Sequence, residues 1–187
     1  LPMRSRLHLP TALEMTPEQA TIHAKVLASR GNADGPFLAW LLAPKLADLA
    51  QELGAVCRYG TSLSQQESEL LILYVAAHYG CRAEQEIHEP IASRAGLSDE
   101  VILAIRTDEI PPLATARLRI LAEFARRLVA DKKAPDDLYQ RAVHLLGETT
   151  LVEAVGVIGY YALVAYTLNA FDMRKASGTD GQPRSNQ

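Results

Sequence analysis

Apolar residues along this chain recur at intervals of three and four, the spacing that places side chains on one face of an α-helix. One such stripe lies between Lys45 and Arg58, where apolar residues repeat on one side of the predicted helix: Leu46, Leu49, Ala50, Leu53 and Val56. Strict two-residue alternation, the pattern of a half-buried strand, does not occur, so we assign no sheet. The pattern predicts an all-α fold.

A capping box, Ser64-Gln65-Gln66-Glu67, predicts that a helix begins at Gln65 and runs to about Tyr79. Its run Leu70–Ala77 is apolar on every side, which is typical of a helix buried all round. Gly80 supplies a left-handed residue that ends it. We expect this helix to be the most buried element of the fold.

The next predicted helix runs from Cys81 to about Ala95 and stops at Gly96; a kink or local break after Glu89 is compatible with Pro90. Caps, prolines and apolar periods predict the remaining helices at Pro17–Arg30, Ser98–Arg106, Ala114–Ala130 and Pro135–Leu146, and from Thr149 or Thr150 to about Phe171.

Length and composition favour one substantial domain. The 187 residues are 48% hydrophobic, which is enough for a real core over residues 1–176. Residues 177–187 are polar without an apolar period, and we expect a disordered tail there. Because the chain starts at Leu1, we expect an initiator methionine or a longer leader to precede it.

Charge and cysteine usage narrow the class of protein. A formal net charge of −3 and a pI of about 6.0 provide no basic stripe, so we expect no nucleic-acid partner. Cys57 and Cys81 are the only two cysteines, which suits a reducing, cytoplasmic location better than export. No run of eighteen apolar residues and no signal-peptide pattern occur, so we expect no membrane partner.

Candidate chemistry gathers around residue 81. Cys81, Glu84 and His88 follow at i, i+3 and i+7, so a thiol, a carboxylate and an imidazole share one helix face. Glu69 lies on the otherwise apolar preceding helix, where a buried carboxylate needs a partner. Glu69 is either a catalytic carboxylate or a structural acid, and His88 fits as its partner under both interpretations.

Each of the other residues has a functional and a plain interpretation. Cys81 begins a helix beside Arg82, and both features lower a thiol pKa, which predicts a reactive thiolate; the plain alternative is a small residue at a helix start. Glu84 and His88 form either an acid/base pair or a solvated i, i+4 pair. No His-x-x-x-His or Cys-x-x-Cys spacing occurs, so we predict no metal and no other cofactor.

Three quoted pieces of the chain carry a family resemblance. They are Leu63-Ser64-x-x-Glu67-x-Glu69, Gly80-Cys81-x-x-Glu84-x-x-x-His88 and Ala95-Gly96-Leu97-Ser98. Together they resemble the carboxymuconolactone decarboxylase/AhpD-like family, and the resemblance extends over nearly everything but the tail. It implies a bundle of about seven to eight helices around a central helical hairpin. It also implies a homo-oligomer, a trimer or hexamer, with its pocket near a subunit boundary.

The resemblance is closer to the decarboxylase-like branch than to the peroxidase branch. Peroxidase members carry a Cys-x-x-Cys, and here Glu84 stands where the second cysteine would be, so no resolving thiol is present in the motif. The decarboxylase-like branch has a glutamate four residues before its histidine, which Glu84 and His88 match. A tryptophan often follows that glutamate, and this chain has Gln85.

Three functional hypotheses follow. The resemblance implies a lyase in which His88, oriented by Glu69 or Glu84, transfers a proton on a small carboxylated lactone or related acid, with Arg58 or Arg82 holding the substrate carboxylate. The alternative is a peroxiredoxin-type antioxidant that uses Cys81 alone with an external thiol. The third is a helical assembly or binding protein that keeps the family shape without catalysis.

Overall fold

The structure is a computed structural model that describes residues 3–175. Its described part contains nine helices, which confirms the all-α prediction: α1 (Pro17–Arg30), α2 (Pro36–Trp40), α3 (Pro44–Tyr59), α4 (Gln65–His78), α5 (Arg82–Arg94), α6 (Asp99–Arg106), α7 (Ala116–Asp131), α8 (Asp136–Leu146) and α9 (Glu148–Ala170). The predicted disordered tail, 177–187, lies outside the described residues.

Backbone contacts divide the chain into two compact units. The first contains the described residues up to Asp48 and from Thr167 on, and the second is Leu49–Tyr166. The prediction of a single domain over 1–176 stays a prediction.

In the first unit, α1 begins with a capping box in which Thr16 and Gln19 satisfy each other's backbone N–H groups. The Trp40 indole N–H donates to Thr167 Oγ1 at 3.0 Å, so the buried ring has its polar atom satisfied. Two antiparallel strands, β1 (Met3–Arg4) and β2 (Arg174–Lys175), pair near the ends of the described chain. Our assignment of no sheet was therefore wrong, because strands of two residues are too short to show an alternating pattern.

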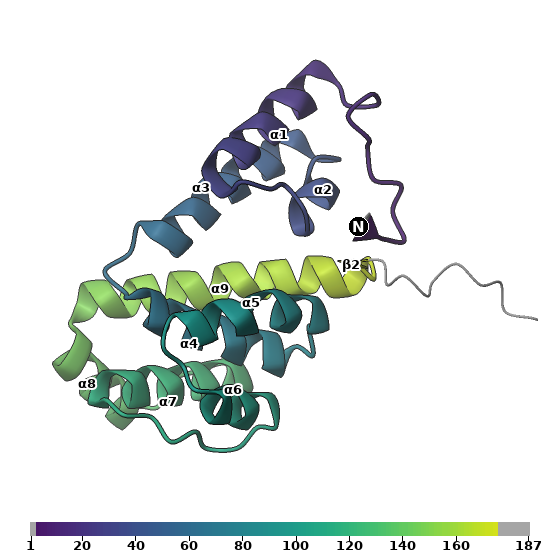
Figure 1. The fold of residues 1–187 in the computed structure, drawn as a ribbon. Coiled ribbons are helices and arrows are strands. Elements are labelled where there is room, and N and C mark those ends of the chain that lie inside the picture. The colour runs from purple at the N-terminus through teal and green to yellow at the C-terminus, as the bar shows by residue number, and fades with distance from the viewer. Residues whose placement is uncertain (1–2, 176–187) are drawn as a thin grey trace, which may run out of the picture. The chain divides into compact units, whose positions relative to one another are not determined.

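The second unit is built around α4, which packs against α5, α6 and α7, while α7 packs against α8 (Figure 1). Every residue of α4 from Glu67 to Ala76 is buried, as the all-round apolar run predicted. Its capping box is present, with Ser64 Oγ accepting from the Glu67 N–H and Glu67 accepting from the Ser64 N–H. Sequence and structure agree on where this helix starts.

Glu67 also joins two helices. Arg117, in the first turn of α7, donates from Nε to Glu67 Oε1 at 2.7 Å and from Nη2 to Oε2 at 3.3 Å. Partial burial raises the Glu67 pKa, but the bonds from Arg117 and Ser64 outweigh it, so the pKa is lowered overall. One carboxylate therefore caps α4 and holds α7.

The α5 helix runs unbroken through Pro90, so the break that we considered after Glu89 does not occur. The predicted start of α9 was also off by two or three residues, since the helix starts at Glu148, ahead of both threonines that we expected to cap it. Both differences concern helix ends and interiors where local signals are weak.

By length and composition α9 could cross a membrane, with a mean hydropathy of 1.6 over its most apolar window. However, 56% of that window is buried inside the structure, and core helices of globular proteins meet the same criteria of length and composition. The expectation of no membrane partner stays a prediction.

Candidate functional site

Glu69 is placed by the most buried helix of the fold. It lies on the second turn of α4 and is 2% exposed, among leucine and isoleucine side chains that cannot solvate it. An ionised carboxylate in such surroundings requires a charged or hydrogen-bonding partner.

That partner comes from α5, which starts after a tight turn. Gly80 has a φ of 58°, and the Cys81 N–H donates to the Ala76 carbonyl at 2.8 Å, so the chain reverses within a few residues. Cys81 is the N-cap of α5, and Glu84 and His88 follow one turn apart on its buried face. The hairpin thereby turns these two side chains toward α4.

The structure brings Glu69, Glu84 and His88 together, and we call these three residues the His88 cluster. His88 Nδ1 lies 2.7 Å from Glu69 Oε2, a hydrogen bond between α4 and α5. His88 Nε2 lies 3.3 Å from Glu84 Oε2, at ion-pair distance. This contact is an ion pair and not a hydrogen bond, so Glu84 Oε2 has no hydrogen-bond partner among residues 3–175. The Nε2–H is therefore the less committed of the two imidazole protons.

The cluster is arranged to keep His88 charged. Burial alone would lower the pKa of His88, but the contacts with Glu69 and Glu84 and their negative charges raise it to about 9. The imidazole is therefore protonated at neutral pH, and its Nδ1–H donates to Glu69. A histidine in this state is a proton donor rather than a base.

Tyr161 of α9 lies beside the imidazole and was missed as a site residue from the sequence. Its ring centroid is 5.3 Å from that of His88, with the planes at 88°. Burial raises the Tyr161 pKa well above its ordinary value, and the negative charge of Glu84 adds to this. In the sequence, the adjacent tyrosines 160 and 161 lie in an apolar run, which favours an interpretation as core aromatics. A buried phenol needs a polar neighbour, but this rule does not predict which residue that neighbour is.

The two candidate arginines lie in different surroundings. Arg58, at the end of α3, is half-buried, and its charge opposes the rise in the Tyr161 pKa, which places it near the cluster. No ion pair joins Arg58 to a carboxylate within the described chain; its guanidinium lies 5.5 Å from the Tyr59 ring centroid. Arg82 is exposed on the first turn of α5. Of the two, only Arg58 is brought toward the His88 cluster.

Cys81 is not the reactive thiolate that its position suggested. It is fully buried, and this burial raises the pKa of the thiol to about 11 despite backbone hydrogen bonds from Glu84 and Ala83, with the Glu84 charge raising it further. The prediction of a lowered pKa was wrong because helix-start amides are outweighed by the loss of water. Neither Cys57 nor Cys81 forms a disulfide within residues 3–175.

The His88 cluster is poorly placed to ligate a metal. No group of three or more His, Cys, Asp and Glu residues between 3 and 175 is arranged to hold a metal ion. In the His88 cluster both imidazole nitrogens face carboxylates, so neither presents a lone pair to a cation.

The cluster is also enclosed. Its three side chains are at most 6% exposed, so Glu84 and His88 do not form the solvated pair of the plain interpretation. None of the three cavities described for the second unit is lined by them. Contact between carboxylate and imidazole is thus present, and it lies outside these three cavities.

Comparison with known proteins bears on the family. The sequence pattern of the carboxymuconolactone decarboxylase family matches residues 44–127, the stretch from α3 into α7 that carries the whole His88 cluster. This stretch is therefore similar to that family. The family resemblance drawn from the three motif pieces is thereby confirmed. No curated protein matches the chain in sequence.

Solved structures show the same fold over nearly the whole chain. An uncharacterized peroxidase-related protein from Silicibacter sp. TM1040 superposes with a TM-score of 0.77 at 16% identity, over 95% of each chain. A second, described as an alkylhydroperoxidase AhpD core from Ralstonia eutropha JMP134, gives 0.74 at 17% identity, over 92% of this chain and 93% of that one. The debrominase Bmp8 gives 0.73 at 12% identity, over 90% and 91%. At these identities the solved structures establish architecture, not reaction.

Proposed function

We propose that the protein is a lyase that decarboxylates a small carboxylated lactone or related acid, with His88 as the proton donor. The observation that carries the proposal is the buried 2.7 Å bond between His88 Nδ1 and Glu69, with Glu84 beside Nε2. The family of residues 44–127 supports the substrate class.

The His88 cluster suits the proton-transfer step of a decarboxylation. The carbon–carboxylate bond breaks, carbon dioxide leaves, and the electron pair passes into the conjugated carbonyl system as an enolate. The Nε2–H of His88 then protonates the carbon, and the imidazole recovers its proton from water. Glu69 keeps the other proton on Nδ1 and fixes the ring, and Glu84 stabilises the charged form.

Arg58 is the proposed anchor for the substrate carboxylate. It is half-buried, close enough to act on Tyr161, and without a carboxylate partner among the described residues. A guanidinium in such surroundings binds a carboxylate more strongly than the exposed Arg82, which water screens. Substrate must displace side chains that cover the cluster, because its atoms are sealed in the single chain.

The test is carbon dioxide release from carboxymuconolactone by the wild-type chain and by His88→Gln. We expect His88→Gln to lower kcat by about a hundredfold or more, since it removes the donated proton and keeps a similar shape. The surface histidine variant His144→Gln is the matched control and should retain full activity. Equal turnover by His88→Gln and wild type would remove His88 from the mechanism.

A second candidate, a redox reaction at Cys81, is favoured by one structural neighbour. A cysteine-to-alanine variant of the debrominase Bmp8 is known in complex with 2,3,4-tribromopyrrole, at a TM-score of 0.73 and 13% identity. In this chain a single-cysteine antioxidant would attack peroxide with the Cys81 sulfur, forming a sulfenate and water or alcohol, and an external thiol would reduce it. Complete burial and a raised pKa oppose that reactivity. If Cys81→Ser consumes peroxide as fast as wild type, the antioxidant candidate is excluded.

A further inference from the structure

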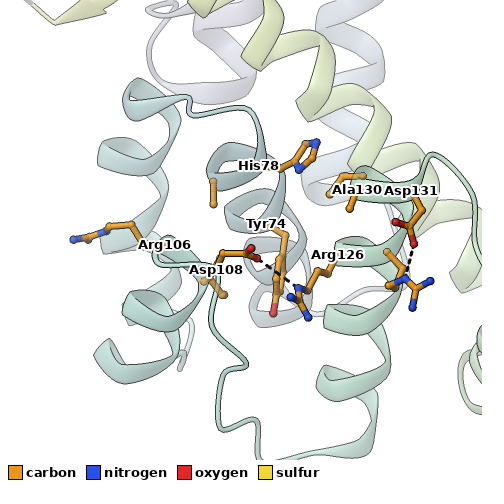
Figure 2. A pocket seen from close by; sticks show the side chains of 11 residues that line it. Tyr74, His78, Arg106, Asp108, Arg126, Ala130 and Asp131 are labelled. Carbon is orange, nitrogen blue, oxygen red and sulfur yellow. Dashed lines mark hydrogen bonds and ion pairs between the residues drawn. The ribbon is translucent and has the colours of Figure 1, made fainter.

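A cavity of about 510 Å³ lies in the second unit between α4, α6 and α7, away from the His88 cluster. Ala77, Ile105 and Val129 form its apolar wall. Figure 2 shows its polar side chains, with Tyr74 of α4 next to the Asp108–Arg126 pair. His78 lies one turn after Tyr74 on α4. Its volume is within the range of small-molecule sites, and most of the residues that line the cavity are polar or charged, which favours a polar or charged ligand.

Tyr74 is the most telling residue of this cavity. The residue is only 7% exposed, and its hydroxyl makes no hydrogen bond to any residue between 3 and 175. Burial raises the Tyr74 pKa to about 12, so the hydroxyl keeps its proton and is available as a donor. Its oxygen is not one of the fully enclosed polar atoms, so the hydroxyl is open to the cavity and can donate to a ligand there.

Arg126 is the available cation of the cavity. Of the three arginines that line it, Arg106 is bound by both oxygens of Glu89 and points away in Figure 2. Arg127 is held by Asp131 at 2.6 Å. Arg126 has only a 3.5 Å contact with Asp108, whose side chain is 85% exposed and therefore easily exchanged for another anion.

We propose that this cavity binds a small carboxylate ligand, which replaces Asp108 on Arg126 and accepts a hydrogen bond from the Tyr74 hydroxyl. A planar carboxylate matches a guanidinium and one further donor, whereas a neutral ligand has no charge with which to replace Asp108 on Arg126. Tyr74 and Arg126 also line an adjoining cavity of about 290 Å³, so the two donors are accessible from both sides.

His78 contributes shape rather than charge. Burial lowers its pKa, and the charge of Lys132 lowers it further, so the imidazole is neutral at physiological pH. The site is also separate from the His88 cluster. Tyr74 follows Glu69 by five residues, which places the two side chains about 140° apart around α4.

The experiment is a titration of the full chain with benzoate, a small aromatic carboxylate, followed by calorimetry. The neutral isostere benzamide serves as the ligand control. We expect saturable benzoate binding that is weakened roughly tenfold in Arg126→Met and several-fold in Tyr74→Phe, with no comparable binding of benzamide. Thermal unfolding of each variant verifies that it is folded.

Matched variants test whether benzoate binding depends on this cavity. Arg94→Met removes an exposed arginine on α5, and Tyr139→Phe removes a hydroxyl from a different cavity; both should bind benzoate like wild type. His88→Gln should also bind it normally, so failure of the lyase proposal leaves this one intact. No saturable binding to wild type, or equal affinity in Arg126→Met, overturns the proposal.

Discussion

At the scale of single residues, the charge state of His88 is the property with the widest consequences. Its pKa is raised to about 9 because two buried carboxylates favour the imidazolium more than burial opposes it. A group whose pKa is higher in the folded than in the unfolded chain binds its proton more tightly when folded. The folded state is therefore favoured wherever that proton is present.

This charge state predicts a pH dependence of stability. The contribution of His88 should be complete below a pH of about 6.5, the ordinary imidazole pKa, and should be lost as the pH rises through about 9. Urea unfolding of wild type and His88→Gln, from pH 6 to pH 10, measures it. The difference in unfolding free energy should shrink with rising pH, whereas His144→Gln should show no such trend. A difference that grows with pH would contradict the assigned charge state.

A second residue-scale prediction concerns Cys81. Because its thiol is fully buried with a pKa raised to about 11, it should react with an aromatic disulfide reagent at pH 8 far more slowly than free cysteine does. The measurement uses Cys57→Ala so that only one thiol is counted, in native and in urea-unfolded protein. Rapid stoichiometric labelling of the native protein would show an accessible thiolate and revive the antioxidant candidate.

At the scale of secondary-structure elements, α5 is notable because it contains a proline, Pro90, in its interior. Pro90 lies on an exposed face of the helix. Because proline has no backbone N–H, it cannot donate the helical hydrogen bond to the Glu86 carbonyl. The helix continues nonetheless, and its buried face carries Glu84 and His88. Packing of that face against α4 outweighs the cost of the proline.

Replacing the proline should therefore stabilise the protein. We expect Pro90→Ala to raise the free energy of unfolding by about 1–3 kcal/mol, since it restores a backbone hydrogen bond and removes a steric conflict. Urea midpoints at an unchanged slope measure the effect. Pro112→Ala, at an exposed position outside the helices, is the control and should not raise stability. A loss of stability in Pro90→Ala would show that the proline fits the bent backbone.

Helix positions were largely predictable because their signals are local. The capping box at Ser64 and the all-apolar run after it located α4 to within a residue. The pairing of β1 with β2 was not predictable, since it joins positions more than 160 residues apart through strands of two residues. The same division holds for the site. The i, i+4 relation of Glu84 and His88 could be taken from spacing, but Tyr161 arrives from a helix far along the chain.

The chemistry of Cys81 was mispredicted for a related reason. Sequence shows its neighbours on the helix, and these lower a thiol pKa. It does not show how much water the fold removes, and that removal determines the sign of the shift. Local electrostatics can be inferred from residue order, whereas burial is a property of the folded chain.

At the scale of the whole molecule, the second unit leaves an apolar helix face uncovered. Leu49, Leu53 and Val56 of α3 are 68%, 49% and 55% exposed, and their spacing of four and three places them on one side of the helix. Contiguous exposed apolar surface of this kind marks interaction sites. It supports the proposed homo-oligomer, whose trimeric or hexameric order stays a prediction.

Charge placed on this face should prevent assembly. The double variant Leu49→Glu, Leu53→Glu should lower the mass measured by light scattering to that of a single chain, because two carboxylates would have to be buried without partners. Leu103→Glu changes one exposed leucine of α6 and should leave the mass unaltered. An unchanged mass in the double variant would place the interface elsewhere.

The shared carboxylate of Glu67 has a consequence for how the molecule opens. It accepts from Ser64 at the start of α4 and from Arg117 of α7, fifty residues further on. Fraying at the first turn of α4 therefore also breaks the hydrogen bonds between Glu67 and Arg117 of α7. The two helices should then lose their amide protection against hydrogen exchange as one cooperative unit. Glu67→Gln would uncouple them, and the end of α4 would then exchange independently of the helix it now holds.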